Sequence, residues 1–184
     1  MTKRRIPLLT AALLLTCLAL SAETKAAATA CEKKAQILLD KVLEMWNKGN
    51  MAVIPELYCA DIVVMTSSMP EPYIGHEGVK KWVENTRVMM PDLVMAFPEV
   101  IATPDRIVTV WTMTGTQTGP MVMPGGTLPP TGRKASITGM SIDYLRNGKF
   151  VKEVVVFNML EMLMPLGFQL MPPGPPVPPV PPVQ

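Results

Sequence analysis

Apolar residues recur at helical spacing in three segments of the first half of the chain. We predict that the first helix begins near Thr29 and Glu32, which have capping-box spacing, and stops at Gly49. A second, short helix is expected over Val53 to Tyr58, and a third follows Gly75 and ends at Pro91-Asp92. The residues that share a face are Ala35, Leu38, Leu39, Val42, Met45 and Trp46 in the first helix, and Val79, Trp82, Val83, Thr86 and Met90 in the third.

Short β-branched or alternating segments dominate the rest of the chain and predict strands. These segments are residues 62–66, 93–102, 106–117, 134–144 and 149–159, and a loop rich in Gly and Pro covers 119–132. Pro98 indicates an edge position or a bulge for its strand, because proline cannot donate to the ladder. Asn147-Gly148 predicts a type I′ turn between the last two strands.

Helices grouped before a run of antiparallel strands favour an α+β fold with the helices on one face of the sheet. A strongly curved antiparallel sheet that is closed by N-terminal helices forms a cone. The interior of such a cone is the natural place for a small-molecule site. We therefore expect one domain, over residues 31–168, built around an apolar pocket.

The two ends of the chain differ from this domain. Residues 1–21 combine three basic residues, a short apolar run and small residues, which is typical of a signal peptide. The apolar run is too short to span a bilayer, so we expect no stable membrane span in the mature form. Residues 22–30 read as a linker. Residues 169–184 form a proline-rich tail, which fits a stiff spacer or a ligand for an aromatic groove of a partner.

Export predicts a secreted or periplasmic protein, in a compartment that permits disulfides. Lipidation at Cys17 or Cys31 is the less favoured alternative. For Cys31 and Cys59 the sequence leaves both a disulfide and two free thiols open. Cleavage removes three cations and leaves 14 basic against 15 acidic residues, from the 17 and 15 of the whole chain. Nothing in this charge suggests a nucleic-acid partner.

Candidate chemistry is sparse. His76 is the single histidine and no Cys-x-x-Cys occurs, so we predict no metal site and no cofactor. Phosphate-binding loops and a Gly-x-Ser-x-Gly nucleophile are also missing. The sixteen methionines are more informative, because several fall in core-like segments and thioethers adapt to irregular apolar shapes. They fit either plain core filling or the lining of a pocket.

Several short motifs in collinear order resemble the SnoaL-like polyketide cyclase (ester cyclase) family, of the nuclear-transport-factor-2-like superfamily. The matching segments are Tyr73 to Val79, Pro91 to Leu93, Trp111 to Gly119, Pro130 to Arg133, Gly148 to Val151 and Leu163 to Gly167. The resemblance implies the cone fold. It also implies cofactor-free aldol cyclase or isomerase chemistry, in which a carboxylate in an apolar pocket acts as acid and base.

At the positions that carry the family's chemistry this sequence departs from it. The family's catalytic aspartate corresponds to Asn158, which can only exchange hydrogen bonds. A frequent histidine corresponds to Met65, and a frequent aromatic residue corresponds to Val154. By alternation from Asn158 and Met140, we expect Glu153 and Asp143 to face away from the pocket.

We therefore predict a pocket into which Asn158 projects as the candidate catalytic residue. The predicted lining residues are Met65, Trp82, Trp111, Met113, Met140, Ile142, Val154 and Val156. The expected partner is a small apolar carbonyl-type ligand, which is either converted by an enzyme or held by a non-catalytic binding protein. The resemblance also implies a homodimer.

Overall fold

A computed structural model of the chain describes residues 29–123 and 125–169. The signal peptide predicted over residues 1–21, most of the linker and nearly all of the proline-rich tail lie outside the described residues. In the described ranges, no helix has the length and apolar character required to cross a membrane.

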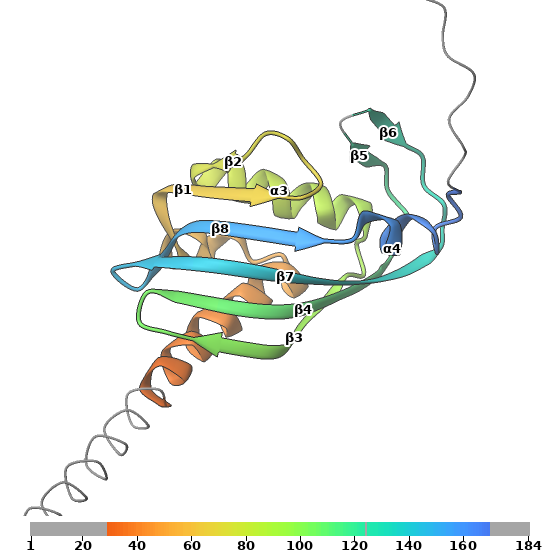
Figure 1. Cartoon of the computed structure of the whole chain (residues 1–184). Helices are drawn as coiled ribbons and strands as arrows, with labels where there is room; N and C mark the ends of the chain where they lie inside the picture. Colours follow the sequence, from red (N-terminus) through yellow and green to blue (C-terminus); the bar gives the residue numbers. More distant parts are fainter. Residues whose placement is uncertain (1–28, 124, 170–184) are drawn as a thin grey trace, which may run out of the picture.

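A six-stranded sheet in the order β2-β1-β8-β7-β4-β3 forms the body of the domain (Figure 1). The predicted α+β class with a curved, mostly antiparallel sheet is confirmed; one pair, β1 with β8, is parallel. A separate hairpin of β5 and β6 occupies the segment that we predicted as a Gly- and Pro-rich loop. The strands are β1 (Tyr58–Thr66), β2 (Tyr73–Ile74), β3 (Val94–Ala102), β4 (Arg106–Thr116), β5 (Met121–Met123), β6 (Gly126–Leu128), β7 (Lys134–Arg146) and β8 (Lys149–Phe157).

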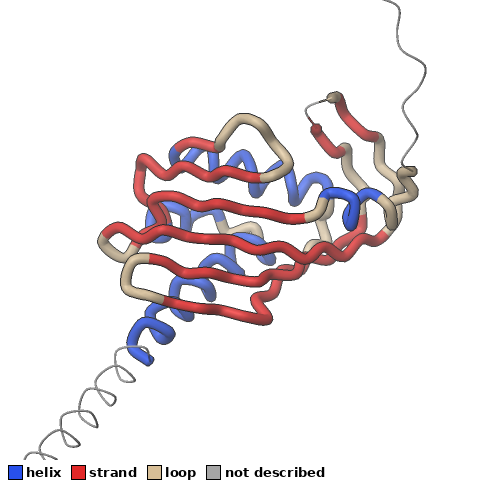
Figure 2. The backbone as a smooth tube through the Cα atoms, viewed as in Figure 1, coloured by secondary structure: helices blue, strands red, loops and turns tan. Residues whose placement is uncertain are grey.

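The helices cover one face of this sheet (Figure 2). The N-terminal helix, described from residue 29 to residue 48, lies behind β3 and β4. Because the helix is already present at residue 29, residues 29 and 30 of the predicted linker are helical. A short helix pair follows, η1 (Met51–Val53) and α2 (Ile54–Leu57). Behind β1 and β8 lies α3 (Gly75–Met89), and α4 (Met159–Leu163) follows the last strand.

Local chemistry explains two boundaries that the sequence predicts. Asn147 and Gly148 both have positive φ, 54° and 76°, as a type I′ turn requires. Pro98 lies on β3, an edge strand, at the point where its register with β4 shifts between Ala96 and Glu99. Both predictions are confirmed.

Polar contacts join the helical layer to the sheet. Asn47, near the end of the N-terminal helix, forms two reciprocal hydrogen bonds with the backbone of Met95 on β3, at 2.6 and 3.0 Å. Within the sheet, Arg146 at the end of β7 forms an ion pair with Asp61 on β1.

Cys31 and Cys59 are free thiols, and the Sγ of Cys59 lies 3.8 Å from the carbonyl oxygen of Arg146. The structure therefore has no Cys31–Cys59 disulfide.

Candidate functional site

A cavity of about 340 Å³ lies between the helical layer and the inner face of the sheet. Its volume falls in the range of pockets that hold drug-sized ligands. Most lining side chains are apolar, and they include eight methionines and eight aromatic residues. The methionines are Met69, Met89, Met95, Met113, Met121, Met123, Met159 and Met162, and the aromatic residues are Tyr58, Tyr73, Trp46, Trp82, Phe97, Trp111, Phe150 and Phe157.

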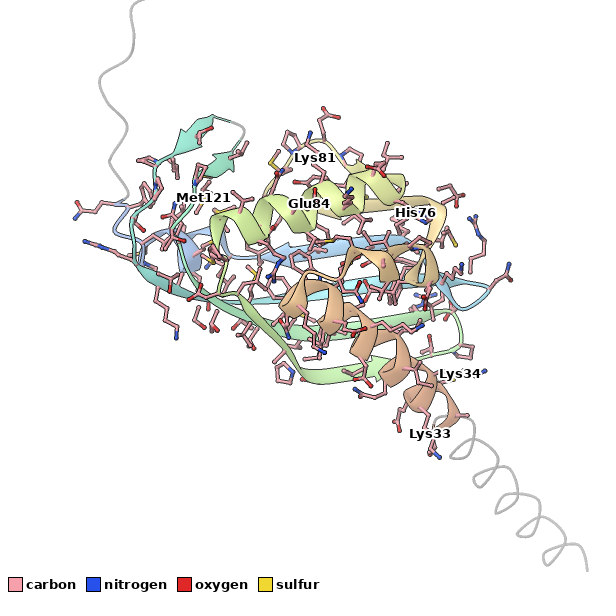
Figure 3. All side chains as sticks on the ribbon, turned by 180° about the vertical axis from the view of Figure 1, so that it is seen from behind. Lys33, Lys34, His76, Lys81, Glu84 and Met121 are labelled. Atoms are coloured by element: carbon pink, nitrogen blue, oxygen red, sulfur yellow. The ribbon has the colours of Figure 1, made fainter. Side chains whose placement is uncertain are left out.

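The cavity has an open and a closed end. Its exposed lining residues are Asn85 and Val88 from the C-terminal part of α3, and Pro120 and Val122 at the β5–β6 hairpin. Met121 of this hairpin lies near the end of α3 in Figure 3. The mouth therefore lies between α3 and the hairpin, and the fully buried Tyr58 and Phe150 mark the opposite end.

A buried glutamine holds the base of the hairpin. The side chain of Gln117 is fully buried and donates to the carbonyl oxygens of Gly119 and Pro129, at 3.1 and 3.0 Å. Its own oxygen accepts hydrogen bonds from the backbone N–H and the hydroxyl of Thr131, at 3.0 and 2.7 Å. All the hydrogen-bonding capacity of this amide therefore goes to fixing the two strands at the edge of the mouth.

Two carboxyl groups face each other at the closed end. Asp143 on β7 and Glu153 on β8 are directly paired in the antiparallel register, so their side chains lie on the same face of the sheet. Both line the cavity and both are buried, with 5% and 8% of their surface exposed. The lining of the described cavity contains no Lys, Arg or His that would neutralise them.

Burial changes the protonation of this pair. It raises the pKa of Glu153 to about 7, and a hydrogen bond with the Tyr58 hydroxyl partly offsets that rise. Burial, together with the charge of Glu153, raises the pKa of Asp143 well above its usual value. The pKa of Tyr58 is also raised by burial, so its hydroxyl remains a donor. Burial therefore favours the protonated form of Asp143, which lies beside a Glu153 that is partly ionised at neutral pH.

Three further polar groups lie on the same inner face. Thr109 on β4 pairs in register with Ser141 on β7. The indole N–H of Trp111 donates to the Ser141 hydroxyl at 3.0 Å, which fixes the ring across the sheet. The ring lies over Gly139, where an added Cβ would stand 2.1 Å from it. Glycine at 139 therefore makes the space that Trp111 occupies in the cavity wall.

Of the residues predicted from the sequence to line the pocket, three do so: Trp82, Trp111 and Met113. The other five lie on the outer face of the sheet, and the prediction for them is wrong. Met65, Met140 and Val156 are about half exposed, and Ile142 and Val154 are partly exposed. Ser141, Asp143, Glu153 and Val155, which alternate with these residues, face the cavity instead.

Asn158 is also misplaced by the sequence interpretation. It is an exposed residue that does not line the cavity. Strand β8 ends at Phe157, and Asn158 caps α4, where its side-chain oxygen accepts a hydrogen bond from the N–H of Leu160 at 3.1 Å. An N-cap is an ordinary structural role of asparagine.

Asp143 and Glu153, which the sequence predicted to face away from the pocket, line the cavity, and that prediction is wrong. A bulge between Tyr144 and Leu145 shifts the register of β7 and β8, and only with this shift do Asp143 and Glu153 become partners. The sequence did contain one signal of the inner face of β7: Ala135, Ile137 and Gly139 alternate in step with Ser141 and Asp143.

No cluster of three or more His, Cys, Asp or Glu occurs among the described residues, and His76 contacts the carbonyl oxygen of Tyr58 at 2.9 Å.

Comparisons with known proteins bear on this geometry. The model of the SnoaL-like polyketide cyclase family matches residues 36–166. No curated protein matches the chain. Among solved structures, TsrD from Streptomyces laurentii has a TM-score of 0.65 at 21% identity, over 73% of this chain and 96% of that chain.

Two further structures agree in fold. IdmH from Streptomyces antibioticus, described as a candidate polyketide cyclase, has a TM-score of 0.60 at 23% identity, over 72% of this chain and 98% of that chain. A Catenulispora acidiphila protein with a ketosteroid isomerase-like fold, solved with trimethylamine, has a TM-score of 0.60 at 12% identity, over 73% and 97%. The nuclear-transport-factor-2-like fold implied by the sequence is confirmed.

Proposed function

Because the chain belongs to the SnoaL-like polyketide cyclase family, we propose that it is a cofactor-free cyclase or isomerase acting on a small apolar carbonyl compound, with Glu153 as the base. The observation that carries this proposal is the pair of buried carboxyl groups, Asp143 and Glu153, at the closed end of an apolar cavity. An aldol ring closure and a double-bond shift both begin with removal of a proton next to a carbonyl group. One positioned carboxylate is sufficient for that step.

Glu153 has the properties that this step needs. With a pKa of about 7, it is partly ionised at neutral pH and is a stronger base than an exposed glutamate. The Tyr58 hydroxyl holds it in place. The apolar walls exclude water and orient the ligand, so that the acidic carbon is held against the carboxylate. The raised pKa of Asp143 favours its neutral form, which avoids two adjacent negative charges.

The alternative is a binding protein that holds the same ligand without converting it. That hypothesis was motivated by Asn158, by Met65 and by the signal peptide, and neither Asn158 nor Met65 lines the cavity. The acid pair therefore favours catalysis over carriage. Native mass spectrometry of protein purified from its own host identifies the cargo of a carrier; a ligand retained through purification, together with no catalysis of proton exchange, would favour carriage.

Exchange of substrate protons with solvent deuterium tests the catalytic proposal. The intact protein, incubated in D₂O with a panel of cyclic and aromatic ketones, should incorporate deuterium next to the carbonyl of at least one of them faster than buffer does. NMR measures this directly. If no ketone of a broad panel exchanges faster than in buffer, Glu153 is not a catalytic base.

The outer face of the sheet supports a second copy of the chain as partner. One row of apolar residues in register crosses five strands and consists of Met65, Val154, Ile142, Val108 and Ile101. A second, shorter row beside it consists of Val156, Met140 and Val110. Contiguous exposed apolar surface of this kind is typical of interaction sites. We propose that this face forms a homodimer interface.

A lysine in the middle of this face should separate the dimer. We expect Met140→Lys to give a monomer by size-exclusion chromatography with light scattering, because the charge would be buried without a partner at the interface. Glu84→Lys, on the exposed side of α3, is the control and should remain dimeric (Figure 3). A wild-type protein that is monomeric, or a Met140→Lys protein that still dimerises, contradicts the proposal.

We also propose that the chain is exported, on the basis of residues 1–21. N-terminal sequencing of protein from its native host should find a mature chain that starts near Ala22 or Glu23, in the secreted or periplasmic fraction. A cytoplasmic chain that retains Met1 contradicts export.

A further inference from the structure

Two buried oxygens in the cavity have no hydrogen-bond partner within the described part of the protein. In the described part of the chain, Thr109 Oγ1 and Asp143 Oδ1 are the buried side-chain polar atoms that lack one. Thr109 is 1% exposed and Asp143 is 5% exposed, and both line the cavity. A buried polar group without a partner costs free energy, so native structures rarely keep two of them side by side in an apolar wall without a use.

The sheet register brings these two groups near each other. Thr109 is directly paired with Ser141, and Asp143 is the next residue of β7 on the same face. Diagonal neighbours of this kind have Cα atoms roughly 7–8 Å apart, with their side chains pointing the same way. One ligand oxygen between the two side chains can therefore reach hydrogen-bond distance of both.

The chemistry of the two groups indicates which kind of oxygen they would hold. A threonine hydroxyl donates one hydrogen bond, and a protonated carboxyl group donates one as well. A carbonyl oxygen accepts two hydrogen bonds and donates none. Burial and the charge of Glu153 raise the pKa of Asp143 and so favour its protonated form, in which the pair presents two donors to the cavity.

The neighbouring groups place the rest of the ligand. Glu153 stands directly opposite Asp143, on the side away from Thr109, so a carbon next to the carbonyl would lie against the proposed base. Trp111 lies beside Thr109 on the same face of β4, and thioethers of Met113 and Met95 complete this part of the wall. Rings and thioethers favour a flat, polarisable ligand.

From this arrangement we propose that Thr109 and Asp143 form the anchor for the carbonyl oxygen of a flat, largely apolar ketone. This inference rests on the proposed function, because Glu153 acts on the carbon that the anchor presents. The proton leaves the carbon for the Glu153 carboxylate, and the electron pair moves onto the anchored oxygen as an enolate. The two donors stabilise the negative charge that develops there.

The probes that test the anchor are 2-tetralone, a bicyclic ketone, and tetralin, the same skeleton without oxygen. Thr109→Val keeps the shape of the side chain and removes the hydroxyl. We expect this variant to bind 2-tetralone about fivefold more weakly, which is the usual effect of losing one hydrogen bond, and to bind tetralin as the wild type does. Thr109→Ser, which keeps the hydroxyl, should restore ketone binding. Quenching of tryptophan fluorescence measures each affinity.

Stability without ligand gives a second readout. Removal of an unpartnered buried hydroxyl should raise the melting temperature of Thr109→Val by roughly 3 °C. Deuterium exchange of 2-tetralone in the same variant should slow by about 100-fold, with no change in the pH midpoint that Glu153 sets. A lower melting temperature, or a loss of affinity that is equal for ketone and hydrocarbon, would overturn the anchor.

The two proposals fail in different ways. If Thr109→Val weakens ketone binding selectively but no variant or wild type catalyses exchange, the anchor stands and the catalytic function fails. If the wild type catalyses exchange and Thr109→Val exchanges equally fast, the catalytic function stands and the anchor is wrong. If the wild type and Thr109→Val bind 2-tetralone with equal affinity, the anchor is also wrong.

Discussion

The free energy of unfolding should fall by roughly 3 kcal/mol as the pH rises from about 5 to about 8, because the folded protein holds a proton on Glu153 that the unfolded chain releases. The pKa of Glu153 is about 7 in the folded protein, against an ordinary value of 4.5. The stability from this proton is therefore fully present below about pH 4.5 and is lost as the pH passes through 7. Asp143, whose pKa is also raised, acts in the same direction.

The exposed carboxylates whose pKa is lowered titrate below the range from pH 5 to pH 8. Asp61, Asp92 and Asp105 are exposed carboxylates whose hydrogen bonds, first of all with Arg146, Thr116 and Arg106, lower their pKa, in the case of Asp105 to about 2. Any stability they contribute is present above their ordinary pKa and is lost only in acid. Acid denaturation thus concerns these surface groups, and the decline from pH 5 to pH 8 reports the buried pair.

Urea denaturation at a series of pH values between 5 and 8 measures this effect. Glu153→Gln, which cannot ionise, should flatten the decline, and Glu84→Gln on the exposed side of α3 is the matched control that should leave it unchanged. Stability that is constant or increases over this range in the wild type would mean that the acid pair is not buried as the structure has it.

The second large effect concerns catalysis. Glu153→Gln should slow deuterium exchange of an accepted ketone by about 10²- to 10⁴-fold, the usual range for loss of a general base. In the wild type the rate should rise with pH through a midpoint near 7, because only the ionised carboxylate accepts a proton. NMR at several pH values gives both the rate and the midpoint.

Tyr58→Phe provides a sharper version of this test. The hydrogen bond from the Tyr58 hydroxyl lowers the pKa of Glu153, so its removal should move the midpoint of the rate profile above 7. A residue that served only the packing of the core would not shift this midpoint. An unchanged midpoint in Tyr58→Phe, or full activity in Glu153→Gln, would show that another group is the base.

The local elements were predictable because short stretches of sequence specify them. The Asn147-Gly148 turn needs positive φ at both residues, and few other pairs adopt it without strain. Pro98 could lie only where no ladder hydrogen bond is required. On β4, buried and partly buried residues alternate cleanly, and the two predicted lining residues on that strand, Trp111 and Met113, do face the cavity.

The inner faces of β7 and β8 were not predictable in the same way. Both faces of these strands carry apolar residues, because one face lines the cavity and the other forms the exposed apolar row with Met140 and Val154. Alternation gives the period of a strand but not the side that is buried. The alternation was counted from Asn158 and Met140, and that count assigned Asp143 and Glu153 to the outside. Because charged residues are rarely buried, their residue type did not argue against the assignment.

Asn158 illustrates a different limit. Its count from Gly148 would place it on the last strand if that strand continued, but the chain leaves the sheet after Phe157 and Asn158 caps α4. Strand ends depend on where a neighbouring strand stops offering partners, and that lies outside the local sequence.

The sequence alone determined the three main helical segments, the five long strands, the turn at Asn147-Gly148 and the α+β class, because these follow from local propensity and from periodicity along the chain. It did not predict the β5–β6 hairpin or α4. Only the tertiary structure decided that Glu153 and Asp143 meet inside the cavity while Met140 and Val156 face outward. That choice depends on the bulge in β7 and β8 and on which side the helices cover. Both are relations between segments far apart in the chain, and no local pattern records them.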